Sequence, residues 1–166
     1  MSKIFYPSEL IKFAIEKEQQ SYDMYKNLSE HVKNREVKEV CKLLMEQELN
    51  HEKFYEDLLN KIEDKQSPGV HEDNEYKEYM KVMIEESRVK EKEIIKFKLN
   101  YDQDFTTGKI KEILDYAIER EKDSILFYVG LKPMVDKSFY DQIDHIISEE
   151  GNHIVMINNL KHVLKV

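Results

Sequence analysis

The chain has 166 residues, of which 36% are charged, and its formal net charge is −8. We expect this length to form one domain with a full core, covering residues 1–166. The acidic balance argues against a nucleic-acid-binding protein, because such proteins are usually basic.

The cysteine content and the hydropathy of the chain exclude further classes of protein. Cys41 is the only cysteine, so neither an internal disulfide nor a Cys-x-x-Cys metal site can form, and we expect it to be a buried apolar residue. The sequence contains no run of about 18 apolar residues, so we expect no membrane span. The first residues also lack the apolar stretch of a signal peptide, so we expect a cytoplasmic protein.

Scarce glycine (4) and proline (3) favour a helical protein. The first predicted helix begins at about Ser8, which can cap a helix, and runs to about His31. The second follows a possible cap at Asn34 and runs to about Glu63, before the stop signal at 67–69.

The second half of the chain shows the same organisation. A third helix is predicted from Thr107 to about Gly130, and a fourth from Asp136 or Ser138 almost to the last residue. The long connection, residues 64–106, has a helical pattern of apolar residues and is interpreted as a crossover carrying one or two helices. The pattern comprises Tyr76, Tyr79, Met80, Met83 and Ile84, followed by Ile94, Ile95 and Phe97.

The two halves form an internal repeat, which predicts two helical hairpins, at about 9–63 and 107–165. At an offset of 103, the matches are Ala14 with Ala117, Glu18 with Glu121, Tyr25 with Tyr128, and Leu28 with Leu131. At an offset of 102, Glu48 matches Glu150 and His51 matches His153. The predicted fold is therefore an all-α four-helix bundle built from two hairpins, with a long helix-containing crossover.

The repeat contains a Glu-x-x-His step in each half, Glu48 to His51 and Glu150 to His153. Residues three apart share one face of a helix, so both side chains of a step can reach one metal ion. A lone glutamate lies about thirty residues ahead of each step, Glu18 in one half and Glu121 in the other. Two such steps and two lone glutamates are the ligand set of carboxylate-bridged di-iron four-helix bundles.

Helical periodicity indicates which acids point inward. Glu18 and Glu121 lie on apolar stripes, whereas Glu16 and Glu119 have polar neighbours and are expected to face solvent. Glu149 also precedes His153 closely, but only the glutamate at i−3 occurs in both halves, which favours Glu150. The midpoints between the paired glutamates fall near residues 33 and 135, where turn signals occur. We therefore expect the site to lie deep in the bundle.

A chance arrangement is the alternative, since one Glu-x-x-His step is a weak signal in a Glu-rich chain. It leaves four buried carboxylates without a counter-charge, at a cost of several kcal/mol each. Tyr25 and Tyr128, two turns beyond Glu18 and Glu121, could hydrogen-bond the carboxylates or could be plain core residues. His145 lies near the stripe of His153 and is a weaker candidate for a supporting role.

In these residues the chain resembles the rubrerythrin branch of the ferritin-like superfamily. The resemblance covers nearly the whole chain and rests on the two lone glutamates, the two Glu-x-x-His steps and the tyrosines Tyr22, Tyr25 and Tyr128. It implies an up-down-down-up bundle, bridging roles for Glu48 and Glu150, and two iron ions, with Mn or Zn as alternatives. Glu18 with His51 and Glu121 with His153 would complete the two ions, although this pairing could be swapped.

The chain departs from the family pattern at two points. It has no rubredoxin-type Cys-x-x-Cys pairs, so we expect an external electron donor such as a rubredoxin-like protein. Ser124 stands where rubrerythrins carry an additional glutamate, which leaves four glutamates and two histidines.

The resemblance implies an oxidoreductase that reduces peroxide or dioxygen, in oxidative-stress defence, and a homodimer. One alternative is a ferroxidase or iron-handling protein without catalytic turnover. Another is a structural module that a metal only stabilises.

Overall fold

The computed structural model describes residues 7–62, 74–98 and 107–166. Within them lie five long helices, which confirms the predicted all-α bundle. They are α1 (Pro7–His31), α2 (Arg35–Lys61), α3 (Asn74–Lys98), α4 (Thr107–Leu131) and α5 (Tyr140–Leu164). Two short 3₁₀ helices, η1 (Lys132–Met134) and η2 (Lys137–Phe139), connect α4 to α5. The predicted end at Glu63 and the stop signal at 67–69 lie outside the described residues.

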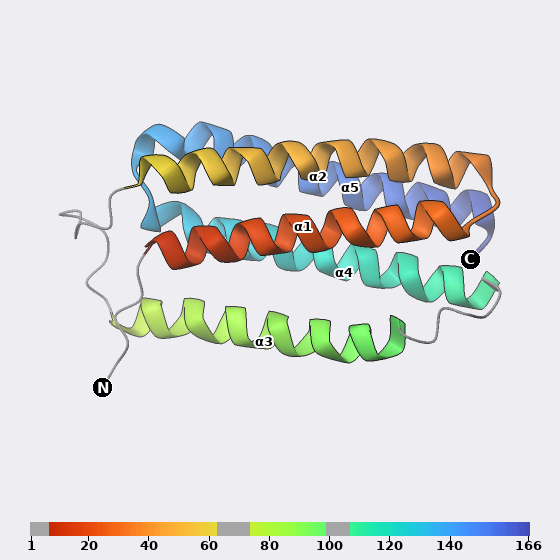
Figure 1. Ribbon diagram of the computed structural model, residues 1–166, viewed down its shortest axis with the longest axis horizontal. Coiled ribbons are helices and arrows are strands. Elements are labelled where there is room, and N and C mark those ends of the chain that lie inside the picture. Colours follow the sequence, from red (N-terminus) through yellow and green to blue (C-terminus); the bar gives the residue numbers. More distant parts are fainter. Residues whose placement is uncertain (1–6, 63–73, 99–106) are drawn as a thin grey trace.

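The bundle is formed by α1, α2, α4 and α5 (Figure 1). α1 packs on α2 and α4 on α5, and the two hairpins meet through α1 with α4 and α2 with α5. α1 and α5 run in one direction, while α2 and α4 run in the other. The crossover containing α3 makes this possible, because α2 and α4 point the same way and a short turn cannot join them.

Helix ends follow the local sequence closely. The Asn34 side chain accepts a hydrogen bond from the Val37 amide at 3.1 Å, which confirms it as the cap of α2. α1 begins at Pro7, so Ser8 lies inside the helix and is not its cap. Proline is favoured at the first helical position because it has no amide hydrogen to leave unpaired. Asp136 caps η2 through the Ser138 amide, and the α-helix itself begins only at Tyr140.

The crossover helix α3 lies along the outside of the bundle, beside α1 and α4 (Figure 1). Met80 and Ile84 on α3 are buried in the core. The Tyr76 hydroxyl donates to the carbonyl of Gly130 on α4, and Arg88 contacts Glu16 on α1 at 3.1 Å. No helix in the described ranges has the length and apolar character needed to cross a membrane.

The apolar core is divided into two clusters. One cluster contains Phe13, Tyr55, Phe127 and Tyr128, together with residues from α3 and α5. The other is built around residues that include Met24, Leu44 and Ile157. The residues between them along the helices are buried and charged, which places a polar layer in the middle of the bundle.

Candidate metal centre

This polar layer contains all six residues that the sequence singled out as metal ligands. α1 provides Glu18, α2 provides Glu48 and His51, α4 provides Glu121, and α5 provides Glu150 and His153. Each side chain is at most 2% exposed. Buried ionisable groups at this density are costly unless opposite charges compensate them.

The six side chains form two overlapping groups whose potential ligand atoms lie within 4.8 Å of one another. One group is Glu18, Glu48, His51 and Glu150, and the other is Glu48, Glu121, Glu150 and His153. Glu48 and Glu150 belong to both groups. The geometry thus has the form of two adjacent ion positions that share two carboxylates.

Both imidazoles turn Nδ1 toward the carboxylates. His51 Nδ1 lies 3.4 Å from Glu18 Oε2 and 3.5 Å from Glu150 Oε1. His153 Nδ1 lies 2.8 Å from Glu150 Oε2 and 3.2 Å from Glu48 Oε1. The two rings stack with centroids 5.7 Å apart. Each histidine therefore faces one group, with its ring held between helices.

The inward-facing atoms of the layer are not satisfied by hydrogen bonds. Within the described part of the chain, Glu48 and Glu150 have no hydrogen-bond partner on either carboxylate oxygen, and neither does Nδ1 of His51 or His153. Native proteins rarely leave buried polar atoms in this state. Oxygen and nitrogen donors that converge without partners fit two divalent cations, which need such atoms as ligands.

Two tyrosines hydrogen-bond the lone glutamates across the bundle. The Tyr25 hydroxyl donates to Glu121 Oε1, and the Tyr128 hydroxyl donates to Glu18 Oε1. Burial raises the pKa of both hydroxyls well above its usual value, and the nearby carboxylates raise it further. The hydroxyls therefore keep their protons and act as donors that orient the two carboxylates.

The four carboxyls are of two kinds, although all of them are buried. Burial raises the pKa of Glu48 well above its usual value, and the charges of Glu150, Glu121 and Glu18 add to this effect. Burial and the charges of Glu121 and Glu18 raise the pKa of Glu150 to about 7. For Glu18 and Glu121, burial has the same sense, but contacts with His51 and His153 outweigh it and lower their pKa.

The histidines show the complementary effect. Burial alone would lower the pKa of His51, but Glu150 and Glu18 outweigh it and raise that pKa to about 11. Glu121 and Glu150 similarly raise the pKa of His153 to about 10. In slightly acid solution, protons on both imidazoles, Glu48 and Glu150 make the layer neutral. Two divalent cations with four carboxylates and neutral imidazoles are also neutral, so protons and metal compete for the same atoms.

Four other residues discussed from the sequence, Glu16, Cys41, Glu119 and His145, lie outside the polar layer. The side chains of Glu16 and Glu119 are 45% and 66% exposed, as their polar neighbours predicted. His145 is on the surface and not in the polar layer. Cys41 is buried, which raises the pKa of its thiol to about 12, so it behaves as an inert apolar residue.

Sequence reasoning missed the position of Glu149. The sequence presents Glu149 only as a rival ligand beside His153, but its Oε2 lies 3.0 Å from His51 Nε2 on the facing helix. Sequence spacing on one helix contains no signal for such a contact. Arg120 was also missed: this buried side chain on α4 donates to the Lys17 carbonyl at 2.9 Å and the Ser21 hydroxyl at 3.1 Å, and so ties α4 to α1.

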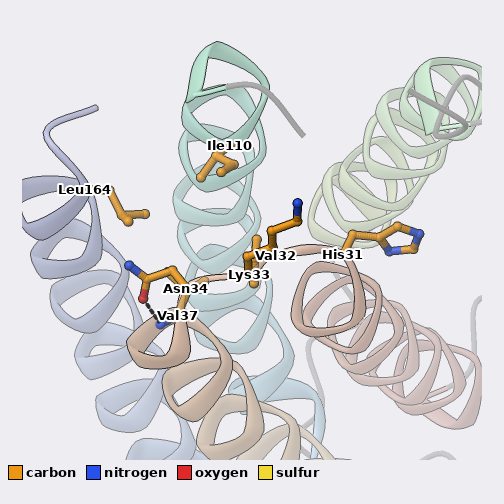
Figure 2. Close-up of a pocket in the computed structure, with 7 residues that line it drawn as sticks. All are labelled: His31, Val32, Lys33, Asn34, Val37, Ile110 and Leu164. Atoms are coloured by element: carbon orange, nitrogen blue, oxygen red, sulfur yellow. Dashed lines mark hydrogen bonds between the residues drawn. The ribbon is translucent and has the colours of Figure 1, made fainter. Parts of the chain in front are cut away.

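A cavity of 330 Å³ lies apart from this layer, at the end of the bundle where α1 turns into α2 (Figure 2). Its lining includes residues of the turn together with Ile110 of α4 and Leu164 of α5. None of the six residues of the polar layer lines it. The cavity and the polar layer are therefore separate features of the bundle.

Comparisons with known proteins agree with this geometry. A protein from Thermotoga maritima, described as a ferritin-like diiron-carboxylate protein, has a similar structure with a TM-score of 0.67 and 26% sequence identity over 95% of each chain. A protein of Archaeoglobus fulgidus is 34% identical over 55 residues, which are 33% of this chain and 87% of that protein. Residues 9–122 match the family model of rubrerythrin. The chain therefore belongs to the rubrerythrin family of the ferritin-like superfamily.

Proposed function

We propose that the protein is a di-iron oxidoreductase that reduces peroxide or dioxygen with electrons from an external donor, such as a rubredoxin-like protein, in oxidative-stress defence. The observation that carries this proposal is the set of buried carboxylate and imidazole atoms that converge without hydrogen-bond partners. Family membership and the likeness to a diiron-carboxylate protein support iron as the metal.

In this proposal, Glu48 and Glu150 would bridge the two ions, because both belong to the two overlapping groups. Glu18 and His51 would complete the ligands of one ion, and Glu121 and His153 those of the other, because each pair belongs to one of the two groups. When bound, two iron ions would supply one electron each and act as Lewis acids, which provides the two electrons that cleavage of a peroxide O–O bond requires.

The remaining residues would prepare the site for that chemistry. Tyr25 and Tyr128 would hold Glu121 and Glu18 in fixed orientations through their hydroxyl protons. The apolar clusters on both sides would exclude bulk water, which strengthens electrostatic interactions within the layer. The polar layer faces little solvent, so the proposal favours a small oxidant over a large organic substrate.

The test begins with anaerobic Fe(II) titration of the metal-free protein, followed by addition of H₂O₂ or O₂ while optical spectra are recorded. We expect two irons per chain and rapid formation of a ferric absorption band. The variant Glu48→Gln should bind fewer than two irons, whereas Glu119→Gln, on the exposed face of α4, should match the wild type. Binding of fewer than two ions by the wild type, or no reaction with either oxidant, would refute the proposal.

Turnover separates this function from iron handling. With a rubredoxin-like donor present, an oxidoreductase should consume many equivalents of H₂O₂ per site. A ferroxidase that only stores or transfers iron should stop after one round and release or retain ferric ions.

A further inference from the structure

We infer that Glu149 is a positioning residue for His51, and that it makes the two metal positions unequal in affinity. The inference rests on the proposed function in one respect, namely that the polar layer binds two metal ions. It concerns the residues behind the histidines, which the repeat does not preserve.

The outer side of the His51 ring contacts a carboxylate on the facing helix. His51 Nδ1 faces the polar layer, and its Nε2 lies 3.0 Å from Oε2 of Glu149 on α5. When Nδ1 binds a cation, the remaining proton of the imidazole must be on Nε2, which then donates to Glu149. A carboxylate in this place fixes the ring orientation and increases the basicity of the ligating nitrogen.

The other half of the repeat has no carboxylate at the corresponding sequence position. At the offset of 102 that relates the Glu-x-x-His steps, Glu149 matches Gln47. His153 Nε2 is buried and has no hydrogen-bond partner in the described ranges, and the same is true of Gln47 Oε1. His153 thus lacks the anionic partner that His51 has.

The difference continues to the molecular surface. Glu149 is 26% exposed, and its Oε2 lies 3.6 Å from Nε2 of His145, whose side chain is 74% exposed. The residue that matches His145 in the first half is Leu43, an exposed apolar side chain. A polar connection therefore leads from the His51 position to solvent, and the His153 position has an apolar residue at the equivalent place.

These contacts predict which ion position fills first. Loss of an outer hydrogen-bond partner of a metal-ligating histidine typically weakens metal affinity by about 10- to 100-fold. We therefore expect the position formed with Glu18 and His51 to bind a divalent cation more tightly than the position formed with Glu121 and His153, by a factor in that range.

The experiment uses Co²⁺ as the probe, because it is stable in air and lies next to Fe²⁺ in the order of ligand affinity. Titration of the metal-free protein, followed by the visible absorption of bound Co²⁺, should show two unequal binding steps. Crystals grown with one equivalent of Co²⁺ should show stronger anomalous scattering beside His51 than beside His153.

Four variants give the matched comparison. Glu149→Gln should weaken the tighter step by about 10- to 100-fold and equalise the anomalous signals. Gln47→Glu should strengthen the weaker step, and the double variant should reverse the order of filling. Glu46→Gln, an exposed position on α2 with the same change in charge, should leave both steps as in the wild type.

Each outcome decides between the two proposals. Equal filling in the wild type, or an unchanged preference in Glu149→Gln, would overturn the role of Glu149 and leave the di-metal site standing. If Gln47→Glu had no effect on the weaker step, the explanation by an anionic partner would also fail. A wild-type protein that binds no Co²⁺ would overturn this inference together with the proposed function.

Discussion

The hydroxyl of Tyr128 on α4 donates a hydrogen bond to Glu18 on α1, although the repeat places Tyr128 two turns beyond Glu121 on its own helix. Tyr25 makes the reciprocal hydrogen bond to Glu121. Seven residues along a helix span about 10 Å, so each tyrosine lies two turns away from the glutamate of its own helix. Each hairpin therefore supplies the hydroxyl that orients the carboxylate of the other hairpin.

Replacing Tyr128 by phenylalanine should destabilise the metal-free protein. The variant leaves a buried carboxylate oxygen without its donor, so we expect the free energy of unfolding in urea to fall by about 1–3 kcal/mol. The neighbouring Tyr55 provides a matched comparison, since its ring lies 5.0 Å from that of Tyr128 and is equally buried. Its hydroxyl has no hydrogen-bond partner among the described residues, so Tyr55→Phe should cause no loss. Similar losses in both variants would contradict this assignment.

The variant Glu48→Gln should raise the melting temperature of the metal-free protein. The raised pKa of Glu48 means that folding at neutral pH requires uptake of a proton, at about 1.4 kcal/mol per pH unit above the pKa of the unfolded state. An amide of the same shape removes this cost. The same change should abolish most of the stabilisation by added Fe(II), measured by thermal unfolding under anaerobic conditions. A lower melting temperature without metal would contradict the interpretation.

The stability of the metal-free protein should fall as pH rises from about 6 to 9. Glu150 and both histidines have raised pKa values in the folded state, to about 7, 11 and 10. A group of this kind contributes its stability below the unfolded pKa and loses it as pH rises through the folded pKa. Melting temperatures measured over this range should show the decrease without metal and a much smaller one with metal.

Metal binding should release protons from the same groups. At pH 6, binding of two divalent cations should release up to four protons per chain, from Glu48, Glu150, His51 and His153. At pH 8 fewer should appear, because Glu150 has already lost its proton. A pH indicator in weakly buffered solution measures the number directly, and release that did not depend on pH would exclude this exchange.

Substitutions of two glycines should have opposite effects on stability. A Cβ atom at Gly130 would lie 2.6 Å from Sδ of Met80, which is fully buried on α3. The contact is with the end of a flexible side chain, but Met80 is enclosed, so Gly130→Ala should cost about 1 kcal/mol through overpacking of α3 against α4. Apart from the neighbouring backbone of α5, no atom of the described residues lies within 4 Å of a Cβ placed at Gly151, so Gly151→Ala should gain about 0.5–1 kcal/mol from helix propensity. Urea unfolding compares both variants, and a gain at Gly130 would show that α3 does not pack tightly there.

Much of the polar layer could be predicted from sequence because helical periodicity is local. Glu18 and Glu121 lie on apolar stripes and Glu16 and Glu119 do not, and this is enough to separate buried from exposed carboxylates. The repeat then indicated that both halves contribute alike. Caps such as Asn34 were readable for the same reason, since a cap depends on a few neighbouring residues.

Contacts between the hairpins could not be predicted from the sequence, because they depend on which helices become neighbours and on how far each helix is shifted along its axis. The partners of Tyr128 and Glu149 lie on facing helices, 110 and 98 residues away in the chain. The repeat does not indicate which glutamate each tyrosine contacts. Periodicity in one chain segment specifies the face of a helix that is buried, which is why the amino-acid sequence was sufficient for the all-α class and the six inward-facing residues. Packing of the four helices sets the distances between those faces, and so it alone established which tyrosine supports which glutamate and how the two halves differ behind their histidines.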